Sequence, residues 1–166
     1  MKRLIVFLGL PILFLFFTLG CKDEVTEPGN GNELIVKPAV TKTLVNYGQE
    51  TFRAAYPDTA SLHKIGEAYK SNYSQEAKNQ FIDYVHVQVG SLGENKEMFI
   101  KCMDLTGCKE TASISLPTNV ERAKYNGEDV WIIQLVWGME PMDLGHYKCF
   151  AIGISKLDTL DFIRCK

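Results

Sequence analysis

The spacing of hydrophobic residues in the first half of the domain predicts three helices. The first helix is expected over about 44–56, because its apolar stripe continues until Pro57 interrupts it. Asp58 or Thr59 can cap a second helix and Ser74 a third. The inward-facing residues of the second and third stripes are Leu62, Ile65, Tyr69, Ala77, Phe81, Ile82, Val85 and Val89.

The end of the third stripe has two interpretations. Residues 84–89 alternate, with β-branched residues at every second position, which also suits a strand. The stripe begins well upstream of this segment, and its spacing there is helical. A helix that ends before Gly90 is therefore the favoured prediction.

After Gly93 the pattern changes to strands that flank short turns. The expected strand pairs are 97–104 with 109–116, 120–125 with 130–137, and 147–155 with 160–166. The second pair flanks Asn126-Gly127, a dipeptide strongly typical of two-residue hairpins. Helices followed by strands predict an α+β fold, with N-terminal helices packed on one face of a C-terminal antiparallel β-meander.

The N-terminal segment has the three-part layout of a secretory signal. Two basic residues precede an apolar run over 4–17, and small residues lead to Cys21. This segment resembles a bacterial lipoprotein signal peptide, although Thr18 stands where that family prefers Leu. The resemblance implies removal of 1–20 and lipidation of Cys21 with three acyl chains, palmitate among them, which is enough for stable anchoring. The alternatives are plain secretion or a retained transmembrane anchor of marginal length.

The residues after Cys21 predict where the anchor is displayed. Lys22, Asp23 and Glu24 resemble an export signal that sends lipoproteins to the outer face of the outer membrane; the alternative is an ordinary solvated tether. Gly, Asn, Pro and Thr dominate the following residues, so 21–38 is expected to be a lipidated Cys and flexible tether. The remainder, 39–166, has the length of a single α+β globular domain.

The net charge of the mature chain narrows the classes of partner that it is expected to bind. Without Lys2 and Arg3, the 18 basic residues fall to 16 against 20 acidic residues, so the mature chain has a net charge of −4. This balance argues against nucleic acid and against electrostatic attraction to anionic lipid. The expected partners are the membrane, through the lipid on Cys21, and an unidentified protein or small molecule.

A second resemblance concerns the domain itself. Three leading helices, the exit Gln88-Val89-Gly90-Ser91-Leu92 and the strand segments 123–128 and 130–133 are similar to small NTF2-like or cystatin-like domains. The resemblance implies a curved antiparallel sheet that wraps a long helix. These families include enzymes and binding modules, so the resemblance does not determine function.

The other four cysteines predict two disulfides, as expected for an even number in an exported domain. Antiparallel pairing about turns near Leu105 and Leu157 would place Cys102 opposite Cys108 and Cys149 opposite Cys165. A metal site made of three of these cysteines and His146 is the alternative, but its ligand spacing does not form the usual close pairs. No metal or other cofactor is expected.

The segment 137–146 is the candidate binding loop. Trp137, Met139, Met142 and His146 make it more apolar than a solvated turn requires, so it is either a contact patch or a lid over the core. The sequence lacks the common hydrolase, nucleotide-binding and zinc-protease motifs. A non-enzymatic binding module is therefore the favoured function. The alternatives are a small hydrolase-like or isomerase-like enzyme with a cone-shaped cavity, in which His146 would work with a nearby acid, and an enzyme inhibitor acting through the loop.

Overall fold

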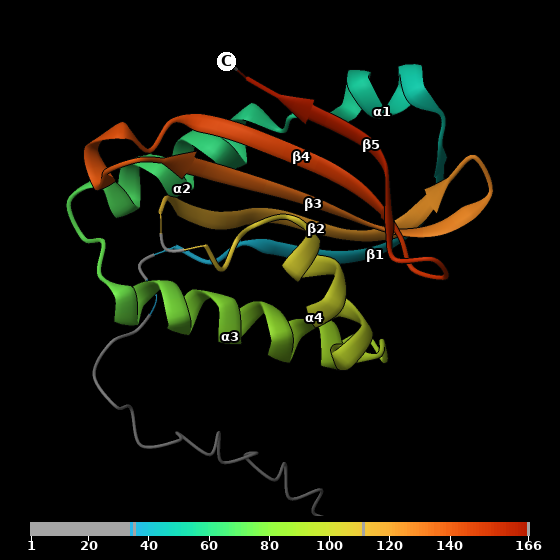
Figure 1. Ribbon diagram of the computed structural model, residues 1–166, viewed down its shortest axis with the longest axis horizontal. Helices are drawn as coiled ribbons and strands as arrows, with labels where there is room; N and C mark the ends of the chain where they lie inside the picture. The colour runs from blue at the N-terminus through green and yellow to red at the C-terminus, as the bar shows by residue number, and fades with distance from the viewer. Residues whose placement is uncertain (1–33, 35, 111, 166) are drawn as a thin grey trace, which may run out of the picture. The chain divides into compact units, whose positions relative to one another are not determined.

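Five strands form one sheet in the order β1-β2-β3-β4-β5. The computed structural model describes residues 34, 36–110 and 112–165, which belong to a compact unit spanning 31–166. Its elements are β1 (Ala39–Tyr47), α1 (Gln49–Ala55), α2 (Thr59–Lys70), α3 (Gln75–Ser91), α4 (Lys96–Leu105), β2 (Ile114–Tyr125), β3 (Glu128–Gly138), the 3₁₀ turn η1 (Pro141–Asp143), β4 (His146–Gly153) and β5 (Asp158–Arg164). The domain is therefore α+β (Figure 1).

The sheet is mixed, because its first strand runs parallel to its neighbour. β1 pairs with β2 in parallel, whereas β2 to β5 form the expected antiparallel meander. A parallel pair needs a long crossover connection, and here α1 to α4 supply it. The predicted order of helices followed by strands is thus only partly right, since a strand precedes the helices.

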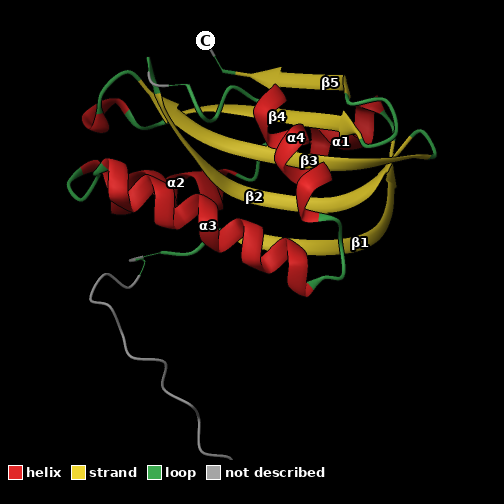
Figure 2. Ribbon diagram, turned by 60° about the horizontal axis from the view of Figure 1, so that its bottom comes forward, coloured by secondary structure: helices red, strands yellow, loops and turns green. Residues whose placement is uncertain are grey.

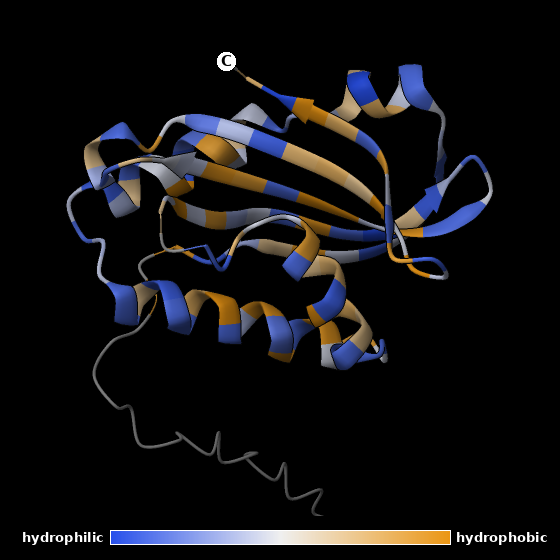
Figure 3. Ribbon diagram, viewed as in Figure 1, coloured by the Kyte–Doolittle hydropathy of each residue, from blue (hydrophilic) through white to orange (hydrophobic). Residues whose placement is uncertain are grey.

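Helices cover both faces of the sheet, not one face as the sequence predicted (Figures 1 and 2). Successive residues of β3 point to opposite faces. Trp131, Ile133 and Leu135 pack with α3 and α4, whereas Val130 and Ile132 pack with Phe52 of α1. α3 accordingly alternates between hydrophobic and hydrophilic bands along its length (Figure 3).

The second and third predicted helices are confirmed with their caps. The Asp58 side chain accepts hydrogen bonds from the first turn of α2, and Ser74 accepts one from Ala77 N in α3. α3 continues to Ser91, so 84–89 is helical. The helix predicted over 44–56 is wrong in its first half, because β1 extends to Tyr47 and α1 begins at Gln49.

The strand predicted over 97–104 is also wrong, because this segment is helix α4. Asn95 caps it, and Phe99, Cys102 and Met103 form its buried face at spacings of three and four residues. The following strand begins only at Ile114. The three remaining turns of the meander lie close to their predicted places. Asn126 and Gly127 both have positive φ angles, of 49° and 83°, as a two-residue hairpin requires.

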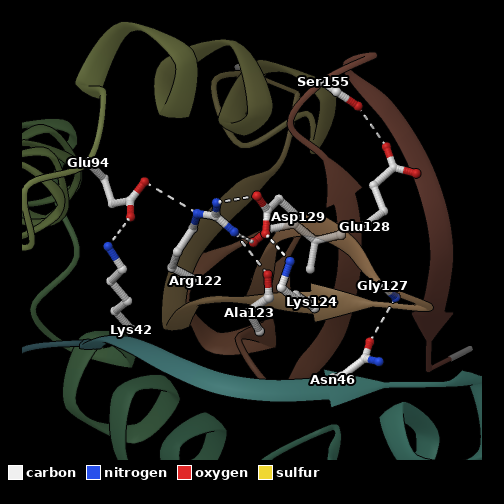
Figure 4. A network of polar contacts seen from close by, with 11 residues as sticks. Lys42, Asn46, Glu94, Arg122, Ala123, Lys124, Gly127, Glu128, Asp129 and Ser155 are labelled. Carbon is white, nitrogen blue, oxygen red and sulfur yellow. Dashed lines mark hydrogen bonds and ion pairs between the residues drawn. The ribbon is translucent and has the colours of Figure 1, made fainter.

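A network of charged residues fixes the end of the sheet near this hairpin (Figure 4). Glu94, between α3 and α4, lies 2.7 Å from Lys42 Nζ of β1 and 3.3 Å from Arg122 Nε of β2. Arg122 Nη2 also lies 3.3 Å from Asp129 of β3. Burial raises the pKa of Glu94, but the hydrogen bonds and charges of Lys42 and Arg122 outweigh it and hold this pKa below its ordinary value. The network therefore ties the connection between α3 and α4 to three strands.

The predictions for the N-terminal segment lie outside the described residues. They comprise the signal peptide 1–20, lipidation of Cys21, the export signal at Lys22, Asp23 and Glu24, and most of the tether. Within the part of the chain that the structure describes, every helix is too short or too polar to cross a membrane.

Candidate functional site

The candidate site lies beside α2, and one buried side chain fixes the start of that helix. Gln134 of β3 is fully buried. Its Oε1 accepts a hydrogen bond from Asp58 N at 2.6 Å, and its Nε2 donates to Asp58 O at 3.1 Å. The same Nε2 donates to Thr118 Oγ1 at 2.8 Å. These bonds hold the α2 N-terminus against the centre of the sheet.

The loop between β3 and β4 forms the other side of the site. Leu144 is 1 % exposed and packs in the core with Leu62 and Ile65 of α2. The loop packs closely on α2, because a Cβ atom built on Gly66 would lie in van der Waals contact with Leu144 O, at 3.4 Å. Met139 and Met142 point outward, with 64 % and 69 % of their surface exposed. The candidate binding loop therefore folds inward at Leu144 while it presents two methionines to solvent.

A cleft of about 270 Å³ lies between α2 and this loop. Its lining includes Leu62, His63, Gly66 and Glu67 from α2, and Leu144 and Tyr147 from the loop and β4. Leu62 and Leu144 are buried, whereas His63 and Glu67 are exposed at the rim. The cleft therefore combines an apolar interior with a few polar groups at its mouth, as small-molecule sites commonly do.

The polar rim has an internal ion pair. Lys70 Nζ donates to Glu67 Oε1 at 2.5 Å. This hydrogen bond, with the charges of Lys70 and His63, lowers the pKa of Glu67. Glu67 is exposed, so this is a weak surface ion pair; the lowered pKa makes the carboxylate a weaker base, and its oxygens can still accept hydrogen bonds from a ligand.

The other predicted loop residues gather on a different surface. Trp137 and His146 are opposite each other in the β3–β4 register, and their ring centroids are 5.1 Å apart. Cys165 Sγ lies 3.5 Å from His146 Nδ1. Neither Trp137 nor His146 lines the cleft. His146 therefore contacts Trp137 and Cys165, and not the neighbouring acids with which the enzyme alternative would pair it.

The reasoning for the two predicted disulfides is wrong. Cys102 lies in α4 and not in a hairpin, and Cys149 is opposite Ile163, so Cys165 is displaced by two residues from the expected register. All four cysteines, Cys102, Cys108, Cys149 and Cys165, are free thiols. Burial raises the pKa of Cys102 to about 11 and also raises that of Cys149. Three of the four are buried.

A buried carboxylate joins β1 and α1 to the sheet on the same side as the cleft. Glu121 of β2 is 5 % exposed. It accepts hydrogen bonds from Thr43 Oγ1 at 2.5 Å, from Tyr47 Oη at 3.1 Å and from Tyr56 Oη. The neighbouring tyrosines reflect this environment, because burial and the charge of Glu121 raise the pKa of Tyr47 to about 12 and that of Tyr56 further. The carboxylate is satisfied by these bonds, which gives it a structural role.

The residues of the cleft on α2 were missed by the sequence analysis, which considered only the core stripe of that helix. His63, Gly66 and Glu67 lie three and four residues apart on a neighbouring face of α2. A glycine in the middle of a helix on this face was the available signal, because it indicates close approach of another segment.

Across residues 34, 36–110 and 112–165, no group of three or more potential ligands could hold a metal ion.

Comparison of the chain with known protein families, with curated proteins and with solved structures found no match. The resemblances to bacterial lipoproteins and to NTF2-like or cystatin-like domains therefore stay predictions.

Gly138 is expected to be essential for the shape of the loop. A Cβ atom there would lie 2.7 Å from Asp143 C and 2.8 Å from Asp143 O, so Gly138→Ala must displace η1. Overpacking of this kind costs about 1–3 kcal/mol, measured as a loss of unfolding free energy in urea. Gly145→Ala is the matched control, since the nearest atom would be 4.0 Å away. Equal effects of the two substitutions would contradict this account of the loop.

Proposed function

We propose that this chain is a non-enzymatic, lipid-anchored binding module of the cell envelope. Its lipid is attached to Cys21 and holds it in the outer membrane, with the domain facing outward. The domain binds a small, mostly apolar ligand in the cleft between α2 and the 138–146 loop. The cleft, with its apolar interior and polar rim, is the observation that carries this proposal.

The chemistry of the rim favours binding over catalysis. An acid–base enzyme needs a group that is free to take a proton from the substrate. The hydrogen bond from Lys70 lowers the pKa of the Glu67 carboxyl, which makes its carboxylate a weaker base. Burial lowers the pKa of His86, which lies on α3 and away from the cleft lining. The arrangement suits a ligand held by apolar contact and oriented by one or two hydrogen bonds.

The anchor is supported by the sequence of the N-terminal segment. We expect the wild-type chain to incorporate labelled palmitate in cells and to partition into the detergent phase, because three acyl chains bind a bilayer stably. Cys21→Ser should abolish both properties and leave the domain folded. Replacing both Asp23 and Glu24 with Ala should keep the lipid but protect the domain from protease added to whole cells. A wild-type chain without lipid would contradict the anchor.

The ligand cleft can be tested by filling it. His63→Trp places a large ring at the cleft mouth, whereas Lys64→Trp places the same ring on the neighbouring exposed residue of α2, outside the cleft. We expect n-hexanol or indole to raise the melting temperature of the wild type and of Lys64→Trp, because a ligand that binds only the native state stabilises it. His63→Trp should show little or no increase. An equal increase in His63→Trp would rule out this cleft as the site.

A further inference from the structure

Two buried polar atoms near the start of β2 and the end of β3 have no hydrogen-bond partner among the residues that the structure describes. They are Ser115 Oγ and Trp137 Nε1. Ser115 is 0 % exposed, and it is directly opposite Trp137 in the β2–β3 register, so both side chains leave the same face of the sheet. A buried unpaired donor costs about 1–3 kcal/mol. Two such groups side by side leave hydrogen-bonding capacity that an acceptor from outside the protein can use.

Two cations flank the same tryptophan. Lys148 Nζ lies 5.0 Å from the Trp137 ring centroid, and Arg164 Cζ lies 6.0 Å from it. Lys148 and Arg164 are opposite each other on β4 and β5. No carboxylate of the described ranges forms an ion pair with either of them. This end of the sheet therefore has unneutralised positive charge in a protein of net negative charge.

A third cation approaches from α3. Lys78 is 3 % exposed, and its Nζ donates one long hydrogen bond, of 3.4 Å, to Glu110 O. Cys108 connects it to the other residues, because Cys108 Sγ donates to Ser115 O at 3.4 Å. Burial raises the pKa of the Cys108 thiol to about 11, while the charges of Lys78, Lys109 and Lys148 act to lower it. The charges of Lys78 and Lys148 thus act on the same buried sulfur, which itself contacts the backbone of Ser115.

We propose that Lys78, Ser115, Trp137, Lys148 and Arg164 form a binding site for a phosphate group, which we call the anion site. An indole N–H and an ammonium group only donate hydrogen bonds, so the ligand must supply acceptors. Phosphate supplies several acceptor oxygens and two negative charges, and Arg can bind it through two parallel hydrogen bonds. Trp137 is half-buried as a residue, while its Nε1 is covered. The anion site shares no residue with the cleft, so each can fail independently.

The two tryptophans of the chain make the anion site directly observable. Trp131 is buried in the core at 1 % exposure, so Trp131→Phe leaves Trp137 as the only fluorescent indole. Titration with sodium phosphate at constant ionic strength, balanced with chloride, should give a saturable change in emission.

Lys148→Gln and Arg164→Gln should each weaken the apparent affinity about tenfold, since hydrogen bonds to charged groups contribute about 1.5–3 kcal/mol. Lys101→Gln, an exposed charge on α4, is the matched control and should have no effect. A response equal to that of chloride, or an equal loss in Lys101→Gln, would overturn the proposal.

Ser115→Ala separates a binding role from a structural one. It removes a hydroxyl that has no partner in the described part of the chain, so the free protein should be at least as stable as the wild type, while phosphate should bind several-fold more weakly. Unchanged phosphate affinity in a destabilised Ser115→Ala variant would overturn the assignment.

Phosphatidylcholine vesicles with and without phosphatidic acid identify the source of the phosphate. A response to free phosphate assigns a soluble ligand, a response only to vesicles with phosphatidic acid assigns a lipid headgroup, and no response to either contradicts the site.

Discussion

Replacing Gln134 with Leu is expected to destabilise the domain by about 2–4 kcal/mol. The two residues have similar size, so the substitution removes hydrogen bonds without opening a large cavity. It leaves Asp58 N without a partner and removes one of the two hydrogen bonds of Asp58 O and of Thr118 Oγ1, which keep Leu62 N and the backbone oxygen of residue 134. Each buried polar group that loses its partner costs about 1–3 kcal/mol, and Asp58 is half-buried, so water satisfies part of the loss. Urea denaturation of wild type and variant measures the difference.

The region of the domain that Gln134→Leu destabilises is as informative as the size of the stability loss. Because Gln134 holds the start of α2, hydrogen exchange should accelerate first in the N-terminal turns of that helix. Gln88→Leu, on the half-exposed surface of α3, is the matched control and should change stability by less than about 0.5 kcal/mol. If α2 exchanges at the wild-type rate in Gln134→Leu, then Gln134 does not position the cleft.

Replacing Glu121 with Leu is expected to cost about 3–5 kcal/mol. Thr43, Tyr47 and Tyr56 all donate to this buried carboxylate, and the substitution removes every acceptor at once. Breaking a buried charged network by removing one partner has effects of this size. Tyr56→Phe removes a single donor and should cost about 1.5–3 kcal/mol. Tyr84→Phe is its control on a half-buried tyrosine outside this network, and a cost equal to that of Tyr56→Phe would contradict the role of Glu121.

The same network predicts how stability depends on high pH. The pKa of Tyr47 is raised to about 12 by burial first and by the charge of Glu121 second. The folded state therefore favours the neutral phenol, so this contribution to stability is complete below about pH 10 and is lost as the pH rises toward 12. Absorbance at 295 nm should show delayed ionisation of Tyr47 in the wild type. In Glu121→Leu the ionisation should begin at lower pH; an unchanged titration curve would show that Glu121 does not raise the pKa of Tyr47.

The sequence predicted the elements whose start or turn is determined by residues next to it in the chain. Asp58 and Ser74 marked the starts of α2 and α3, and Asn126-Gly127 marked the hairpin, because each acts on its own backbone. β1 was misassigned because it is an edge strand whose inward side chains, Thr43 and Tyr47, are polar. Their buried partner is Glu121, more than 70 residues away in the sequence, so the strand has no hydrophobic alternation that would reveal it.

The candidate site depended on contacts that the sequence does not display. Gln134 interrupts an apolar strand, but its partner Asp58 is 76 positions away. The cleft requires the side of α2 and the 138–146 loop to meet, which follows from the sheet order and not from either segment alone. The loop itself was recognisable by its composition. Its division between a buried Leu144 and exposed methionines depends on Gly138, whose role is visible only when the opposing backbone is in place.

The most direct test of the proposed function is the amide spectrum of the ¹⁵N-labelled domain during titration with n-hexanol or indole. Gly66 and Gly145 both line the cleft, and glycine amides resonate in a separate region of the spectrum. We expect saturable shifts of these two resonances, with little change at Gly127 in the distant β2–β3 hairpin, and loss of the shifts in His63→Trp but not in Lys64→Trp. Shifts spread evenly over all three glycines, or retained in His63→Trp, would contradict a ligand site in the cleft.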